Sequence, residues 1–216
     1  MINPSSPIQT FFGLLLALGS LPCLALLQRS PPDTWIAYIV GPLCLILAGS
    51  SLLALVLMWE RLPLTSIGLK SPKLETLVWG LVMVGLQLYI VTPIGTDLIT
   101  LLNLPSLNTG IDKLQAFPKG YLLLLGIVSG CVEELFYRGY ATERLGALTG
   151  KIELGGCLAL IAFALSHLPF WGLGGVFFTL FGGSIFTVFY LWRRDLLANM
   201  MAHAAVASIQ LLSISG

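Results

Sequence analysis

Two adjacent carboxylates and an arginine interrupt a hydrophobic stretch in the second half of the chain. They are Glu133, Glu134 and Arg138, in the run EELFYR. An ionisable group at membrane depth costs roughly 2.5–3.5 kcal/mol on insertion scales, so three of them need an explanation. Residues four apart share a helix face, so Glu134 and Arg138 can pair, whereas Glu133 is rotated by about 100° and lacks that partner. A free carboxylate of this kind suits general acid–base chemistry. The alternative is an ion-pair cluster at a helix end.

The two histidines of the chain, His167 and His203, also lie in hydrophobic runs. A single buried histidine is usually a packing residue, but two beside a buried carboxylate pair indicate one site. Asn199 precedes His203 by four residues and shares its helix face. At about 1.5 Å of rise per residue, Glu133 and His203 come roughly 10 and 12 Å above the cytoplasmic ends of their helices. His167 comes roughly 20 Å above its own, unless that helix starts later or is tilted.

Such a site supports two hydrolytic chemistries. Glu133 and the two imidazoles could hold a divalent metal such as zinc, which would acidify a bound water. Alternatively, Glu133 could itself activate a water that the histidines hold. The HExxH signature of many zinc proteases is absent from the sequence. Either chemistry is hydrolysis inside the bilayer, and the sequence leaves the choice open.

The composition is that of an integral membrane protein. Of the 216 residues, 56% are hydrophobic and 10% are charged, where a soluble domain carries about 25% charge. A spanning helix needs about 20 apolar residues, so we expect an all-α, polytopic transmembrane helix bundle of about seven spans. It should form a single membrane domain over residues 1–216. The net charge of +1 gives no sign of nucleic-acid binding. The four cysteines lack CxxC spacing and are expected to behave as small hydrophobes.

The hydrophobic segments are expected at about residues 8–27, 35–59, 74–94, 121–140, 154–168, 173–192 and 196–214. Pro93 and Gly95 should end the third segment, and the stretch 98–104 should be a short apolar turn, with an eighth span as the alternative. Of the 11 Lys and Arg residues, eight fall in one set of loops and three in the other, which places the N-terminus in the cytoplasm. The first segment should be retained, because no Lys or Arg precedes it as in a signal peptide.

At the polar residues the sequence resembles the CPBP family of CAAX proteases and bacteriocin-processing enzymes, also called the ABI family. Its relatives include the type II CAAX prenyl endopeptidase. The family motif EExxxR is matched from Glu133 onward, FxxxH is matched by Phe163 and His167, and a third motif, HxxxN or HxxxD, would begin at His203. The resemblance covers about residues 121–208, which would be the protease core.

The resemblance implies an intramembrane protease, either glutamate-dependent or a metalloprotease. Glu133 would be the general base, and His167 and His203 would hold the water or a metal and stabilise the oxyanion. Glu134 and Arg138 would support them.

One position departs from the family pattern. The third motif would place Asn or Asp at position 207, where this chain has Ala207. Asn199, one turn before His203, could occupy a similar space. If the missing amide is an oxyanion donor, its loss would cost about 10²–10³ in rate.

Three functions are therefore weighed. The first is an endopeptidase that cuts a peptide or membrane-associated protein in a bacterial plasma membrane, with the lipid bilayer as its surroundings. The second, favoured by Ala207, is a non-catalytic membrane scaffold or bacteriocin-immunity-type protein on the same fold. The third is a proton-coupled carrier that uses the Glu/His cluster as a relay, against which the lack of internal repeats argues.

Overall fold

The computed structural model describes residues 6–27 and 35–214, and every regular element in these ranges is helical, which confirms the all-α expectation. The α-helices are α1 (Pro7–Leu27), α2 (Trp35–Ala54), α3 (Leu74–Leu86), α4 (Thr92–Leu101), α5 (Asn108–Gln115), α6 (Lys119–Glu133), α7 (Thr142–Thr149), α8 (Ile152–Ser166), α9 (Leu168–Arg193) and α10 (Leu196–Ile214). Shorter elements are the π-helical stretches η1 (Leu55–Trp59), η3 (Gln87–Val91) and η4 (Glu134–Ala141), and the 3-10 turn η2 (Leu64–Ile67).

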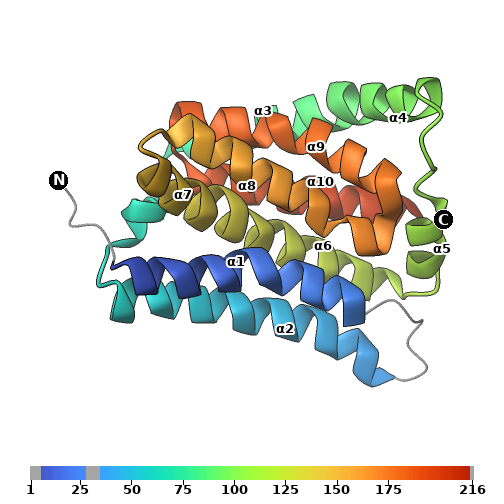
Figure 1. Cartoon of the computed structure of the whole chain (residues 1–216). Helices are drawn as coiled ribbons and strands as arrows, with labels where there is room; N and C mark the ends of the chain where they lie inside the picture. Colours follow the sequence, from blue (N-terminus) through green and yellow to red (C-terminus); the bar gives the residue numbers. More distant parts are fainter. Residues whose placement is uncertain (1–5, 28–34, 215–216) are drawn as a thin grey trace.

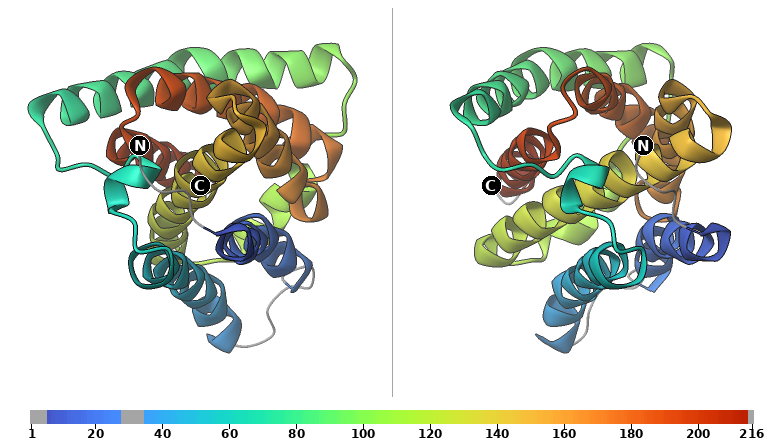
Figure 2. Two further views of the ribbon diagram at one scale, coloured as in Figure 1. Left: turned by 60° about the vertical axis from the view of Figure 1, so that its left-hand side comes forward. Right: turned by 90° about the vertical axis from the view of Figure 1, so that its left-hand side faces the viewer.

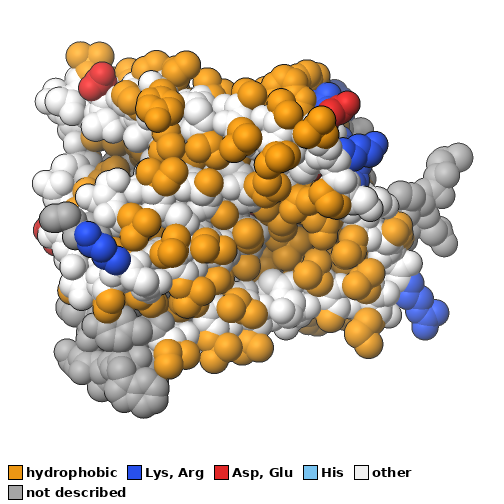
Figure 3. Space-filling model, turned by 180° about the vertical axis from the view of Figure 1, so that it is seen from behind, with side chains coloured by type: hydrophobic (Ala, Val, Ile, Leu, Met, Phe, Trp, Pro, Cys, Tyr) orange, Lys and Arg blue, Asp and Glu red, His pale blue; other side chains and the backbone are white. Residues whose placement is uncertain are grey.

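The protein is a polytopic bundle of membrane-spanning helices. Among the described residues, six helical stretches are long and apolar enough to cross a bilayer: Pro7–Leu26, Ile39–Trp59, Leu74–Leu101, Lys119–Thr149, Leu168–Arg193 and Leu196–Ile214. The remaining predicted segment is α8, a shorter apolar helix of 15 residues. Six full-length spans and one short helix thus stand where about seven spans were expected. Hydrophobic side chains cover the broad flank of the bundle, and charged side chains appear at its two ends (Figure 3).

The third segment is longer than expected. Pro93 and Gly95 do not end it, because α3, η3 and α4 join into one apolar stretch that reaches Leu101. The wider π turn accommodates the proline, whose ring and missing N–H would break a regular α-helix. In this turn the Thr92 N–H donates to the carbonyl of Gln87, five residues back. The apolar residues after Pro93 extend this span, so they form neither a separate turn nor an eighth span.

The helices are arranged in layers. In Figures 1 and 2, α3 and α4 lie along one side of the bundle and α1 and α2 along the opposite side, with α6, α8, α9 and α10 between them. The interior helices α6 and η4 carry the two glutamates, His167 lies at the junction of α8 and α9, and α10 carries His203. All the polar residues of interest therefore come from the middle of the bundle.

Helices α6 and α10 approach each other very closely. Gly126 and Gly130 form a GxxxG pattern on α6, and small residues let membrane helices come near. A Cβ built at Gly130 would lie 2.5 Å from the backbone nitrogen of Ala204, and one at Gly126 would lie 2.7 Å from the Ser208 Cα. No side chain fits at either place. The contact fixes α10 against the turn that leads into Glu133.

Ion pairs hold one end of the bundle together. Glu60 accepts hydrogen bonds from Arg144 (2.6 Å) and from the Tyr140 hydroxyl (2.8 Å), and both charged groups are buried. The Leu196 N–H donates to the carbonyl of Gly68, so the loop after η2 also holds the start of α10. These contacts tie the loop of residues 60–69 to both α7 and α10. The far end of η4 is thereby fixed.

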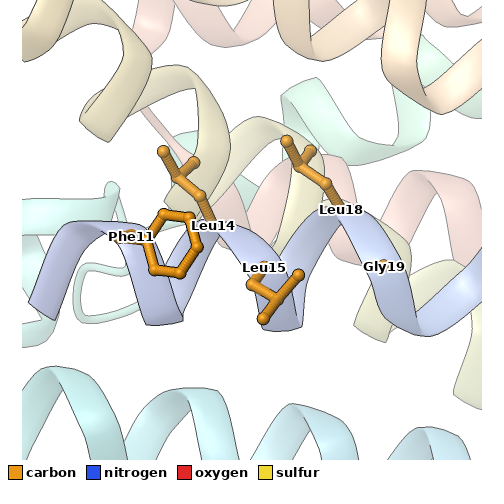
Figure 4. Close-up of a pocket in the computed structure, with 5 residues that line it drawn as sticks. All are labelled: Phe11, Leu14, Leu15, Leu18 and Gly19. Atoms are coloured by element: carbon orange, nitrogen blue, oxygen red, sulfur yellow. The ribbon is translucent and has the colours of Figure 1, made fainter. Parts of the chain in front are cut away.

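A shallow hollow runs along α1, lined by Phe11, Leu14, Leu15, Leu18 and Gly19 (Figure 4). None of these residues has a polar side chain. The hollow therefore offers no side chain for chemistry, unlike the buried polar residues of the interior helices.

Candidate active site

The EExxxR motif lies across a change of helix type. Glu133 ends α6, and the π-helix η4 begins at Glu134 and runs to Ala141. Every residue of η4 is buried. π-helical turns are rare, usually span a single turn and often occur at functional sites. This one turns the two neighbouring glutamates into different surroundings.

Glu134 is the buried hub of the polar cluster and is completely inaccessible to solvent. Its Oε1 accepts a hydrogen bond from Arg138 Nη1 (2.9 Å), the predicted pairing between residues four apart. The same oxygen lies 2.8 Å from His203 Nδ1, and Oε2 accepts from Asn199 Nδ2 at 2.9 Å. Three donors from η4 and α10 therefore converge on one carboxylate. Such pairing is what makes a buried charge tolerable.

The bond to Glu134 sets the tautomer of His203. An ionised carboxylate can only accept, so Nδ1 carries the proton and, in the neutral ring, Nε2 presents a lone pair. This Nε2 lies 3.7 Å from Glu133 Oε2. The imidazole also stacks on Phe186, with ring centroids 5.1 Å apart and planes 25° apart. His203 is thus fixed in both position and protonation pattern.

Glu133 is held differently from its neighbour. Its side chain is 12% exposed, and among the described residues it makes no hydrogen bond. Its nearest ionisable neighbour is His203, at a separation slightly too long for a direct hydrogen bond. A gap of this kind between two acceptors is one that a water molecule can bridge by donating to both. The geometry leaves Glu133 available to act on a water.

The FxxxH motif joins the second histidine to the cluster. His167 Nδ1 lies 2.9 Å from the carbonyl oxygen of Phe163, which can only accept, so Nδ1 again carries the proton. The Phe163 ring packs against His167 (centroids 4.8 Å apart) and His203 (6.1 Å). His167 lies within electrostatic range of Glu133 and of His203. The Phe163 ring therefore contacts both imidazoles, and neither Nε2 atom makes a hydrogen bond among the described residues.

The sequence leaves two ways in which His167 could reach the depth of Glu133 in the membrane: a later start of its helix, or a tilt of that helix. Helix α8 begins at Ile152, earlier than the predicted segment, so the first explanation is wrong. The imidazole nevertheless joins the others through Phe163, whose ring contacts Tyr137 of η4 and His203 of α10.

Arg138 is anchored from several directions. Besides Glu134, its Nη2 donates to the carbonyl of Gly183 on α9 at 3.0 Å. Its Cζ lies 4.2 Å from the centroid of the Phe163 ring, which adds a cation–π contact. A Cβ at Gly183 would lie 2.8 Å from Nη2, so glycine makes room for the guanidinium. Arg138 therefore links η4 to α8 and α9.

Asn199 does not replace the Asn or Asp that the third family motif has at position 207, where this chain has Ala207. Both protons of its amide are committed, one to Glu134 and one to the carbonyl of Phe186 (3.0 Å). It is fully buried. Asn199 therefore supports Glu134 and has no proton free for a developing oxyanion, and Ala207 brings no polar group in its stead.

Glu133, His167 and His203 offer one carboxylate and two imidazole nitrogens, which are chemically suitable for zinc. However, nowhere in residues 6–27 and 35–214 do three or more His, Cys, Asp or Glu side chains come close enough together to hold an ion. In this arrangement the described residues therefore do not fit a metal.

Several residues of the cluster were not foreseen. Gly126 and Gly130 could have been recognised from their GxxxG spacing, which is visible in the sequence. Gly183 and Phe186 give no comparable signal, since their contribution comes mainly from backbone carbonyls that accept from side chains far along the chain.

The fold and the buried polar cluster define an integral membrane protein with a candidate hydrolytic site inside its helix bundle. Residues 115–209 match the model of the type II CAAX prenyl endopeptidase Rce1-like family. The matched part is less than half of the chain and contains all three motif positions, so the suspected resemblance to this family is confirmed over these residues. No curated protein and no solved structure matches the chain. The family supports a CAAX-type intramembrane endopeptidase, which acts on a peptide within a bilayer.

Proposed function

We propose that the protein is an intramembrane endopeptidase in which Glu133 activates the attacking water. The observation that carries the proposal is the contrast between the two glutamates. Glu134 is saturated by three donors, whereas the Glu133 carboxylate has no hydrogen bond among the described residues and faces His203 Nε2 across 3.7 Å. A base must be free to take a proton and must be held near the water that gives it.

The reaction follows from these positions. A water between Glu133 and His203 donates one hydrogen bond to each, which turns an oxygen lone pair toward the substrate. Glu133 takes its proton as the water oxygen bonds to the carbonyl carbon, and the carbonyl electrons move onto oxygen. When the tetrahedral intermediate collapses, the C–N bond breaks and Glu133 returns the proton to the leaving amine. His167 lines the same space and offers a second acceptor.

The proposed substrate is a peptide or a membrane-associated protein, cut at membrane depth. The bias of Lys and Arg toward one set of loops supports a cytoplasmic N-terminus. A bacterial plasma membrane is the proposed location. A bound divalent metal is the alternative to this metal-independent mechanism, and chemical analysis of the purified protein for metal would decide between the two.

Comparison of peptide termini tests the activity. Membrane fractions of host cells that express the wild-type chain are compared with those that express Glu133→Gln at matched levels. New termini should appear only with wild type. Because the Glu133 side chain makes no hydrogen bond to any described residue, the variant should remain folded and unfold in detergent at the wild-type temperature. Glu153→Gln is the matched control, since Glu153 is exposed in the first turn of α8.

Two results would contradict the proposal. Identical sets of termini from wild type and Glu133→Gln in the native host would favour the non-catalytic scaffold, with Ala207 as its sequence correlate. Loss of the new termini with Glu153→Gln as well would show that the effect does not depend on the candidate site.

A further inference from the structure

The proposed reaction needs a group that donates to the oxyanion. In their neutral forms both imidazoles already use their Nδ1–H as a hydrogen-bond donor, His203 to Glu134 and His167 to the Phe163 carbonyl. Their Nε2 atoms are therefore acceptors. Asn199 has committed both amide protons. An oxyanion requires a donor, so one must come from another residue.

Tyr137 carries an uncommitted donor beside these groups. It follows the glutamates in η4, is completely buried, and packs its ring against Phe163 with centroids 4.9 Å apart. Its hydroxyl is near that of Ser166 and within electrostatic range of Glu133. Ser166 donates its own hydroxyl hydrogen bond to the Phe163 carbonyl (2.7 Å). Tyr137 Oη lies close to the Ser166 hydroxyl, but no atom of the described residues meets it with the distance and angles of a hydrogen bond.

A buried hydroxyl without a partner is costly and calls for a reason. Three other buried polar atoms in the described residues share this condition, and each is less suited to the role. Asn199 Oδ1 is an acceptor. Ser208 lies opposite Gly126, about two turns from Glu133. Arg138 Nε belongs to a guanidinium that already packs over the Phe163 ring at 4.2 Å. Tyr137 is the remaining donor near the reacting groups.

We propose that the Tyr137 hydroxyl is the oxyanion donor of this site and supplies the hydrogen bond that the Ala207 side chain cannot. The inference rests on the proposed function. As the water oxygen bonds to the carbonyl carbon, the π electrons move onto the carbonyl oxygen, and Tyr137 Oη–H donates a hydrogen bond to it without transferring the proton. On collapse the electrons return, the C–N bond breaks, and the amine takes the proton from Glu133. Hydrogen bonds of this kind are commonly long before substrate binds and tighten in the transition state.

Tyr137→Phe removes only the hydroxyl and tests the inference. The full chain in detergent is assayed on a synthetic peptide that spans the cleavage site found from the new termini. We expect kcat to fall about 10²–10³-fold with little change in KM, because the bond forms only in the transition state. A peptide with a phosphinate at the scissile position, which imitates the tetrahedral intermediate, should lose affinity by a similar factor. Stability should be unchanged or higher, since an unpaired buried group has been removed.

Tyr140→Phe is the matched control. Tyr140 also lies in η4, but its hydroxyl donates to Glu60 at 2.8 Å. This variant should unfold at a lower temperature and keep its kcat. The inference is overturned if Tyr137→Phe cleaves at the wild-type rate while Glu133→Gln is inactive, or if its unfolding temperature drops as far as that of Tyr140→Phe. Cleavage by Glu133→Gln at the wild-type rate would instead overturn the proposed function.

Discussion

Replacing Gly130 by alanine should separate the helices that bring the reacting groups together. An alanine Cβ would lie 2.5 Å from the Ala204 nitrogen and 2.6 Å from its Cα, and ordinary contact begins at 3.4 Å. The closest contact is therefore 0.9 Å shorter than ordinary contact, and the backbone at Ala204 must move to relieve it. Overpacking of this kind costs about 1–3 kcal/mol of stability. A displacement near 1 Å from the productive geometry can cost about 10²-fold in rate.

We therefore expect Gly130→Ala to remain inserted, to unfold at a lower temperature, and to cleave about 10²-fold more slowly than wild type per folded molecule. Cleavage of the peptide substrate and thermal unfolding in the same detergent measure the two effects. Gly120→Ala on the same helix is the control, because a Cβ there has no neighbour within 4 Å. Wild-type turnover by a folded Gly130→Ala would refute the idea that the close approach of α6 and α10 positions the base.

Two further predictions concern the hub and the metal. Glu134→Gln should lower the free energy of unfolding by about 3–5 kcal/mol, because Arg138 loses its buried partner and the new amide cannot accept as a carboxylate does. Chemical denaturation in detergent would show this, and a variant as stable as wild type would contradict it. Wild-type cleavage should persist in the presence of a strong chelator. Loss of activity that only added zinc restores would show that a metal takes part.

Much of the fold follows from hydrophobic length alone. Each predicted segment is a helix, because about 20 apolar residues in a bilayer have few alternatives to forming one. The errors arise where a local rule meets a special backbone. Pro93 was expected to end a helix, but the π turn before it removes the conflict between the ring and the preceding carbonyl. A sequence does not show such a turn, since it depends on how neighbouring helices pack.

The candidate site likewise combines contacts that the sequence predicts with contacts that it does not. The pairing of Glu134 with Arg138 could be predicted, because residues four apart meet on any helix. The role of Asn199 could not, because its partners, Glu134 and the Phe186 carbonyl, lie 65 and 13 residues away. Its spacing to His203 suggested a shared task with that residue. Both residues do meet at Glu134, but as donors that hold a carboxylate.

The two neighbouring glutamates illustrate how one motif can give two opposite environments. The change to a π-helix at Glu134 turns that side chain into the cluster of donors from η4 and α10, while Glu133, the last residue of α6, stays at its edge. The saturated carboxylate fixes His203 through Nδ1 and thereby decides that Nε2 faces Glu133 as an acceptor. In the proposed mechanism Glu133 is the base because Glu134 is held by its three donors. Those donors are committed to Glu134, which is why the proposal assigns the oxyanion to the Tyr137 hydroxyl, left without a hydrogen-bond partner among the described residues.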